Sequence, residues 1–254
     1  PGRACDRAGT SEGINYCAAV PVLAEGLFSL PHIIPGLYNI SAIIREAGGK
    51  ADHFMRLTGG VPEDFAYFFT SFFPHQCKDG APFFVPTRDE SGEGAITGEG
   101  VWMFDGLDSR HTREDLLAAV LEATGFQARM IIGLIEGQGL KTDALVLSGG
   151  FSRYDGWNQF RADLLGKRLL LPEAGDAELV GCAAVGFKAR GVYSGLQEAA
   201  GAMVRMRQEY TPGAEAHSYY NVRYERWLEL AGRCGEEGVR RASTDFTAGH
   251  SLKR

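Results

Sequence analysis

The chain has 254 residues, of which 44% are hydrophobic and 23% charged, and its formal net charge is −6. This composition excludes a disordered chain and supplies enough apolar residues for a sizeable core, in one large or two modest domains. The 26 Lys and Arg residues are scattered, which argues against nucleic acid as a partner. The 34 Gly residues exceed the usual share without a Gly-x-y period, and so indicate tight turns or close backbone contacts and not collagen.

Apolar and aromatic runs near the start of the chain predict β-strands. Pro and Gly separate three of them, over residues 14–22, 27–34 and 37–44. A helix is expected from about 43 to 57, interrupted at Gly48-Gly49.

The next predicted helix begins at Pro62, followed by the acidic residues Glu63 and Asp64 at the positive end of its dipole. Aromatic residues recur along one face of it, at Phe65, Phe68, Phe69, Phe72 and Phe73. Packing of this face against a core is the favoured interpretation, and stacking on a ligand is the alternative.

Two short strands, 82–86 and 101–104, flank a Gly- and Glu-rich segment that is expected to form an exposed loop. The longest helix is expected to begin after Thr112, because Asp115 completes a carboxylate variant of the capping box. Glycines at 137–139 predict its end.

A strand–helix–strand–helix pattern follows and identifies the fold class as α/β. Its first strand, 144–147, is a continuous apolar run that ends directly in Ser148-Gly149-Gly150. The next three elements span 154–165, 168–171 and 177–189, and the small residues of the last helix would allow close packing. An aromatic helix is expected over 217–230, with a frayed polar end after about 235.

Cysteine usage and hydropathy bear on the compartment. The five cysteines are far apart with no CxxC pair, which argues against a disulfide framework or a structural zinc site. Apolar stretches are interrupted well short of the ~20 residues of a membrane-spanning helix, so no membrane partner is expected. These features favour a cytoplasmic location.

Two glycine-containing turns are the candidates for ligand binding. They are Ala8-Gly9-Thr10-Ser11 and Ser148-Gly149-Gly150. Free backbone N–H groups and hydroxyls in such turns can bind phosphate oxygens, especially at the carboxyl edge of a sheet. Ordinary turns are the alternative, because neither turn is a GxxxxGK[ST] or GxGxxG motif.

The sequence lacks the motifs that several other reaction classes require. No HxxxH or HExxH pair and no GxSxG motif occurs, which argues against a metalloprotease site and an α/β-hydrolase. We expect no metal-binding residue in this chain. Asp163 lies in the ordered α/β unit, where a structural hydrogen bond is favoured over a functional role.

Several motifs in combination resemble the C-terminal half of the FGGY carbohydrate kinases, over nearly the whole chain. The family pattern after the apolar strand is matched by Gly149-Gly150, Trp157, Ala162-Asp163, Gly166, Pro172-Glu173, Gly181 and Ala183-Ala184. Ala8-Gly9-Thr10-Ser11 is similar to the phosphate-contacting turn of the family, and Gly106-Leu107 with His111-Thr112-Arg113 is similar to the opening of its long helix. Tyr210, Pro212 and the segment 220–227 resemble the closing segment.

The resemblance implies a ribonuclease H-like, actin-like ATPase domain, with a central mixed sheet flanked by helices, over residues 1–232. Residues 233–254 would be a polar tail. It further implies that the whole enzyme transfers the γ-phosphoryl group of ATP, with Mg²⁺, to a hydroxyl of a ketose or polyol. The sequence of residues 8–15 resembles that of family members that act on pentuloses, so a xylulose-like ketose is favoured as the acceptor.

The same resemblance implies site residues. Gly9, Thr10 and Ser11 would contact the β- and γ-phosphates, and Gly149 and Gly150 the adenosine and the α-phosphate. A nucleotide-lining helix entry would fall near Gly36 and Ala42, and Tyr154 takes the place of an Asn that contacts nucleotide in some relatives.

Three departures limit the resemblance. Phe151 stands where an Ala is usual, which would reshape the adenine wall, and the segment 84–94 lacks the usual Gly-Glu-Arg. The general base of the family is an Asp in a Gly-Asp-x-x-x-Ala stretch upstream of the Gly-Thr turn. Asp6 is the sole acid before that turn here, and its context does not match.

We therefore expect no catalytic residue in this chain and an N-terminal kinase domain as its partner, with a homodimer as a further option. A non-catalytic nucleotide-binding module of the same fold is the alternative. An actin-like structural protein is a third reading, which the closing segment disfavours.

Overall fold

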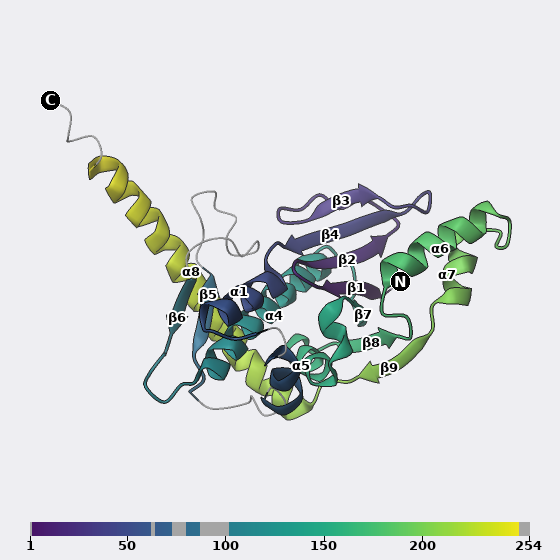
Figure 1. Cartoon of the computed structure of the whole chain (residues 1–254). Coiled ribbons are helices and arrows are strands. Elements are labelled where there is room, and N and C mark those ends of the chain that lie inside the picture. The colour runs from purple at the N-terminus through teal and green to yellow at the C-terminus, as the bar shows by residue number, and fades with distance from the viewer. Residues whose placement is uncertain (1, 62–63, 73–79, 87–101, 249–254) are drawn as a thin grey trace.

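The structure is a computed structural model that describes residues 2–61, 64–72, 80–86 and 102–248 (Figure 1). Its centre is a seven-stranded sheet in the order β3-β4-β2-β1-β7-β8-β9. The strands are β1 (Arg3–Ala8), β2 (Glu12–Ala18), β3 (Phe28–Pro31), β4 (Tyr38–Ile44), β7 (Ala144–Ser148), β8 (Arg168–Pro172) and β9 (Met206–Tyr210). Because β1, β7 and β8 are parallel and all other neighbours antiparallel, the sheet is mixed.

Helices and a second, two-stranded sheet surround this centre. The two-stranded sheet pairs β5 (Phe83–Pro86) with β6 (Trp102–Asp105). The helices are α1 (Ala47–Leu57), α2 (Asp64–Tyr67) with a π-helical continuation η1 (Phe68–Phe72), α4 (Arg113–Gly137), α5 (Asp155–Leu165), α6 (Ala177–Ala189), α7 (Leu196–Met203) and α8 (Ala214–Ala248). A 3-10 helix, η3 (Gly150–Arg153), joins β7 to α5. The predicted fold class, a central mixed sheet flanked by helices, is confirmed.

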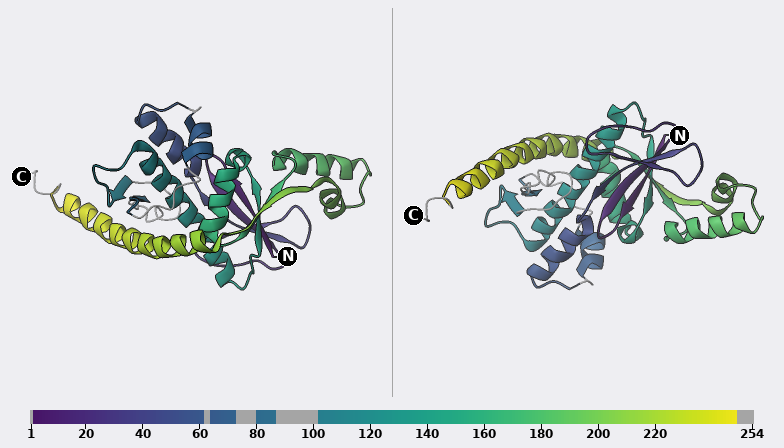
Figure 2. Two further views of the ribbon diagram at one scale, coloured as in Figure 1. Left: turned by 90° about the horizontal axis from the view of Figure 1, so that it is seen from below. Right: turned by 90° about the horizontal axis from the view of Figure 1, so that it is seen from above.

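The two faces of the main sheet differ. Helices α4 and α5 pack on one face of the sheet. Helices α6 and α7 project beyond one end of the sheet (Figures 1 and 2). Along β1, Ala4, Asp6 and Ala8 are buried, whereas Arg3 and Arg7 are exposed. We call the side of β4, β2 and β1 that carries Arg3 and Arg7 the open face.

The predicted long helix is confirmed. The Oγ1 of Thr112 accepts a hydrogen bond from the backbone N–H of Asp115, and Oδ2 of Asp115 accepts one from the N–H of Thr112, which is the expected capping box. By length and hydropathy α4 could cross a membrane, but 78% of its apolar window is buried inside the protein. Helix α4 is thus the central core helix.

Some expectations were wrong. Ile43 and Ile44 end β4, so the helix expected from 43 begins only at Ala47. The close packing expected of the 177–189 helix does not occur among the described residues, since a Cβ on Gly181 or Gly186 would meet nothing within 4 Å. Strand β1, α7 and β9 had no sequence prediction.

Helix α8 is longer than the aromatic helix expected over 217–230, and the predicted domain boundary at 232/233 lies within it. The indole of Trp227 donates to the carbonyl oxygen of Phe84 at 3.0 Å, which fastens α8 to β5. Residues 62–63, Phe73 and the whole loop expected over 89–100 lie outside the described residues.

A buried ion cluster connects α5 to the first hairpin. Arg161 is fully buried, and its Nη2 donates to Oδ2 of Asp6 at 2.7 Å and to Oε1 of Glu12 at 2.5 Å. Asp6 is in β1 and Glu12 begins β2, so one guanidinium holds both strands of the hairpin against the helix.

The variant Arg161→Met tests this connection. It leaves two buried carboxyl groups without a cation, and we expect it to lower the free energy of unfolding by about 3–5 kcal/mol. Arg168→Met is the control, because the ion pair of Arg168 with Glu209 is exposed and worth at most about 1 kcal/mol. Urea denaturation measures both, and equal losses in the two variants would contradict the proposed role.

Candidate functional site

The two predicted glycine turns meet at one edge of the sheet. β1 and β7 are parallel neighbours, with Arg7 opposite Ser148, so the turns that follow them lie side by side. Gly149 has a φ of 97°, and a Cβ on it would come within 2.1 Å of the carbonyl oxygen of Ala8. Only glycine fits there, because any side chain would push the two backbones apart.

A third backbone segment completes the site. The N–H groups of Gly48 and Gly49, in the first turn of α1, donate to the carbonyl oxygens of Gly9 and Thr10, each at 3.0 Å. A Cβ on Gly48 would lie 2.5 Å from the oxygen of Gly9. The sequence predicts this Gly-Gly pair only as an interruption of a helix, although it comes shortly after the predicted strand 37–44, much as Gly149-Gly150 comes after the strand 144–147.

The turn between β1 and β2 has unused donors. Among the described residues, the N–H groups of Thr10 and Ser11 have no acceptor, and both side chains end in hydroxyls. On the other side of the junction, a Cβ on Gly150 would meet nothing within 4 Å. Donors beside open space, held by a glycine-only contact, fit the phosphate groups of a nucleotide.

Aromatic side chains form a wall next to this junction. Phe69 stacks on Tyr154 with 5.0 Å between ring centroids, and Phe151 lies 5.2 Å from Phe69 and 5.3 Å from Trp157. Phe65, Phe68 and Phe69 are buried, which confirms core packing for these three members of the predicted face. Tyr154 and Phe151 are only half-buried and border the site.

Two other positions, which were expected to line the nucleotide, do not reach the junction. Ala42 is 1% exposed within the core, and Gly36 lies in the β3–β4 turn. Asp163 accepts hydrogen bonds from the side chain of Gln159 and the N–H of Gly213, in keeping with a structural role. Asp6 is bound to Arg161 and fully buried, so it is not placed to act as a base.

The carboxyl group of Glu12, next to the Gly9–Ser11 turn, has an unusual environment. Burial raises its pKa to about 8, aided by Asp6 and opposed by Arg161. Its protonated form is therefore favoured in the folded protein more than in the unfolded chain.

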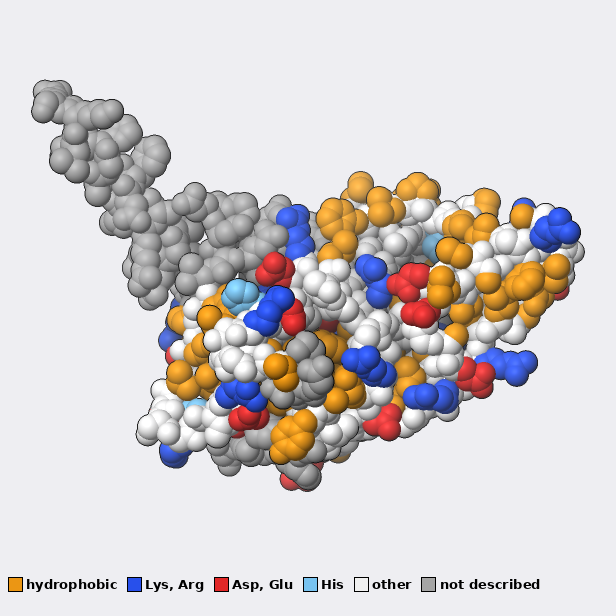
Figure 3. Space-filling model, viewed as in Figure 1, with side chains coloured by type: hydrophobic (Ala, Val, Ile, Leu, Met, Phe, Trp, Pro, Cys, Tyr) orange, Lys and Arg blue, Asp and Glu red, His pale blue; other side chains and the backbone are white. Residues whose placement is uncertain are grey.

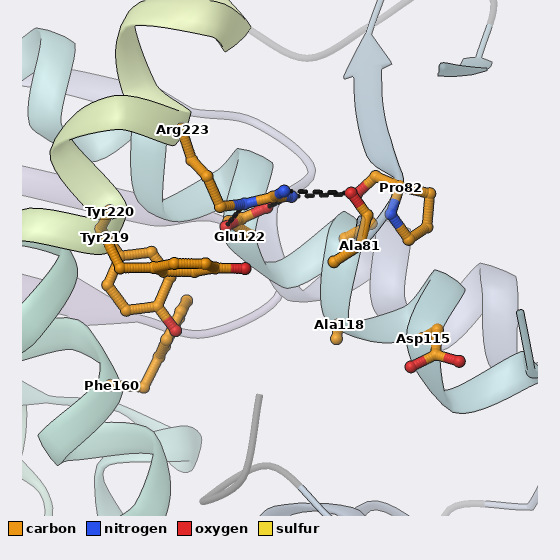
Figure 4. A pocket seen from close by; sticks show the side chains of 10 residues that line it. Ala81, Pro82, Asp115, Ala118, Glu122, Phe160, Tyr219, Tyr220 and Arg223 are labelled. Carbon is orange, nitrogen blue, oxygen red and sulfur yellow. Dashed lines mark hydrogen bonds and ion pairs between the residues drawn. The ribbon is translucent and has the colours of Figure 1, made fainter. Parts of the chain in front are cut away.

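Away from this junction, a hollow is lined by residues of α4, α5 and α8. A structural ion pair fills it (Figure 4). Arg223 donates to both carboxylate oxygens of Glu122 and to the carbonyl oxygens of Ala81 and Pro82. The guanidinium lies 4.0 Å from the centre of the Phe83 ring. These contacts use four of the five N–H groups of Arg223, and we assign the hollow to fold stability. Within the described part of the chain, no cluster of His, Cys, Asp and Glu could hold a metal ion.

The variant Gly149→Ala tests the backbone contact. We expect a loss of about 1–3 kcal/mol or more, from the positive φ and from the overlap with Ala8. Gly150→Ala is the matched control, since a methyl group there has free space, and its effect is expected within about 1 kcal/mol. Chemical denaturation distinguishes them, and an unchanged stability of Gly149→Ala would contradict the geometry.

The pKa of Glu12 leads to a pH prediction. Since the folded-state pKa is raised, the stability contributed by neutral Glu12 is fully present below about pH 4.5 and is lost as the pH rises through about 8. Glu12→Gln does not titrate, so its free energy of unfolding falls less steeply between these values. The difference in slope reaches at most about 1.4 kcal/mol per pH unit, and identical slopes in denaturation experiments would contradict the shift.

Comparison with known proteins gives consistent matches. The model of the C-terminal domain of the FGGY family of carbohydrate kinases matches residues 8–190. The L-xylulose/3-keto-L-gulonate kinase of Escherichia coli is 28% identical over 148 residues, which are 58% of this chain and 29% of the relative.

Solved structures show the same fold. Xylulose kinase from Rhodospirillum rubrum superposes with a TM-score of 0.77 at 21% identity, over 92% of this chain and 47% of that chain. Plasmodium falciparum glycerol kinase with ADP gives 0.72 at 13% identity, over 90% and 47%. The chain thus spans about half the length of these structures and less than a third of the curated relative.

Proposed function

Because the chain belongs to the FGGY family of carbohydrate kinases and matches its C-terminal domain, we propose that it is the ATP-binding half of a sugar kinase. The observation that carries this proposal is the junction of the Gly9–Ser11 turn with Gly149-Gly150. There, unused N–H donors border open space at the carboxyl edge of the sheet.

The residues take separate roles in this proposal. Thr10 and Ser11 donate their N–H groups and hydroxyls to the β- and γ-phosphates, and Gly9 lets the turn approach them. The adenosine and the α-phosphate lie along Gly149 and Gly150, with Phe151 and Tyr154 as an aromatic border. Ala42 has no direct contact in this arrangement, because its side chain is buried.

The reaction proposed for the whole enzyme is phosphoryl transfer to a sugar. ATP supplies the γ-phosphoryl group, and the acceptor is a hydroxyl of a ketose or polyol, a xylulose-like ketose being favoured. This chain fixes the phosphates and excludes water from one side, while its rigid turns keep the donors oriented. In this proposal Mg²⁺ enters bound to the phosphates of the nucleotide.

The other half of the kinase is the proposed partner. Exposed apolar side chains indicate the surface on which it docks. They gather over β3 and over α6 and α7, with charged side chains between them (Figure 3). Leu23 and Ile33 on one side and Leu179 and Phe187 on the other are 45–97% exposed. Relatives about twice as long supply a domain large enough to cover both.

Three free cysteines among the described residues fit the proposed cytoplasmic location.

A non-catalytic nucleotide-binding module is the second candidate. The burial of Asp6 against Arg161 fits both candidates, because this acid serves as a base in neither of them. The natural coding sequence upstream of Pro1 separates the candidates. A Gly-Asp-x-x-x-Ala stretch there supports the kinase, and a start codon there supports the module.

Nucleotide binding is tested with the double variant Thr10→Ala, Gly150→Val. The added isopropyl group fills the space beside Gly150, so we expect ATP affinity, measured calorimetrically, to fall about tenfold or more. Gly133→Val is the control, because Gly133 is exposed in α4 with free space around it. Equal ATP affinity in the double variant and the unaltered chain would overturn the site assignment.

A further inference from the structure

Helix α5 is bonded to both glycine turns through two buried side chains of one face. Asn158 and Arg161 are three residues apart, which makes them neighbours on the helix surface, and both are 0% exposed. Arg161 reaches the strands on either side of the Gly9–Ser11 turn, and Asn158 reaches the segment that contains Gly150. One helix therefore connects the two parts of the proposed nucleotide site.

The bonds of Arg161 end close to the Gly9–Ser11 turn on both sides. Glu12 follows Ser11 directly, and Asp6 is three residues before Gly9. The Nη2 atom of Arg161 donates to the carboxyl groups of both Asp6 and Glu12, at 2.7 and 2.5 Å. Because a single nitrogen bonds both acids, a displacement of the guanidinium would move both ends of the turn.

Asn158 is connected to the other turn by two consecutive hydrogen bonds. Its Nδ2 donates to the carbonyl oxygen of Ser152 at 2.7 Å, and the Oγ of Ser152 donates to the carbonyl oxygen of Gly149 at 2.7 Å. Nδ2 also donates to the hydroxyl of Tyr210 at 3.2 Å, and that hydroxyl donates to Asp155. The amide is thus held in one orientation, with its donor directed at the segment after Gly149.

Helix α5 is itself fixed against the core helix α4. A Cβ on Gly125 of α4 would come within 2.7 Å of Cδ1 of Leu164 and within 3.5 Å of Nη1 of Arg161. The two helices therefore touch at this point, and α4 closes the far side of the guanidinium. The side chains that reach the turns start from a backbone that has no room to shift towards α4.

Stability alone does not account for these buried polar groups. Among the described residues, Nε and Nη1 of Arg161, Oδ1 of Asp6 and Oδ1 of Asn158 have no hydrogen-bond partner. Buried polar atoms without partners lower stability, and apolar side chains of similar size often stabilise a fold as well as a buried ion cluster does. The position of Arg161 and Asn158 behind the two turns indicates a role in keeping those turns in place.

From this arrangement we propose that Arg161 and Asn158 are positioning residues for nucleotide binding. Arg161 sets the place of the donors for the β- and γ-phosphates, and Asn158 sets the place of the turn along the adenosine and the α-phosphate. The inference rests on the proposed nucleotide site. It adds that neither residue contacts the nucleotide, and that each controls the affinity for a different part of it.

The test compares the binding of MgADP and of AMP in NMR titrations of the ¹⁵N-labelled chain, whose spectra also report folding. In Arg161→Met the Gly9–Ser11 turn loses its support, so ADP affinity should fall about tenfold and AMP affinity by less than about threefold. In Asn158→Leu both affinities should fall by the same factor, because the part shared by the two ligands is affected. Arg161→Lys keeps a cation with N–H donors and should recover most of the ADP affinity.

Arg223→Met is the matched control. It removes another buried arginine from a carboxylate, that of Glu122, and Arg223 contacts neither turn. It therefore measures the effect of lost stability alone, and we expect it to bind ADP and AMP as the unaltered chain does. Arg161→Gln, which can still donate to one of the two acids, replaces Arg161→Met if the latter gives the spectrum of an unfolded chain.

Three results would overturn the proposal. They are equal ADP affinity in the Arg161 and Arg223 variants, an equal loss of ADP and AMP affinity in the Arg161 variant, and unchanged affinity for both nucleotides in Asn158→Leu. If the unaltered chain binds ADP and the variants give any of these results, only the positioning role fails. If the unaltered chain binds neither nucleotide, the proposed nucleotide site fails, and the positioning role fails with it.

Discussion

The candidate site depends on one constraint: two strand ends approach so closely that no side chain fits between them. The missing Cβ of Gly149 allows its backbone to lie against the carbonyl oxygen of Ala8, and Gly48 makes a similar contact with Gly9. These contacts fix the turn at Thr10 and Ser11 without using its N–H groups, which stay free for a ligand. A rigid set of donors needs little reorganisation when charge arrives, which is what phosphate binding and phosphoryl transfer require.

The two faces of the sheet contain different features. The inner face, covered by α4 and α5, contains the core and the cluster in which Arg161 holds Asp6 and Glu12 behind the Gly9–Ser11 turn. The open face carries a polar hollow, lined by Arg7, Asn15, Asn39 and Ser148, between two exposed apolar areas (Figure 3).

Local patterns predicted much of this fold. The apolar run before Gly149, the capping box at Thr112 and the strands between 14 and 44 depend on near neighbours in the chain, and all were confirmed. Strand β1 escaped prediction because Asp6 is tolerated inside the protein only through Arg161, which is 155 residues away. The role of Gly48 was missed for the same reason, since its partner, Gly9, lies in another strand connection. The hollow lined by Arg7, Asn15, Asn39 and Ser148 could not be foreseen, because it combines three strands near the start of the chain with β7, which is far along it.

The central claim is that the Gly9–Ser11 turn and Gly149-Gly150 bind the phosphates of a nucleotide together. The most direct measurement is a crystal structure of the chain with a non-hydrolysable ATP analogue. We predict β- and γ-phosphate oxygens within about 3 Å of the N–H groups of Thr10 and Ser11, with the α-phosphate against Gly150. Phosphates bound elsewhere on the chain, with both turns unoccupied, would contradict it.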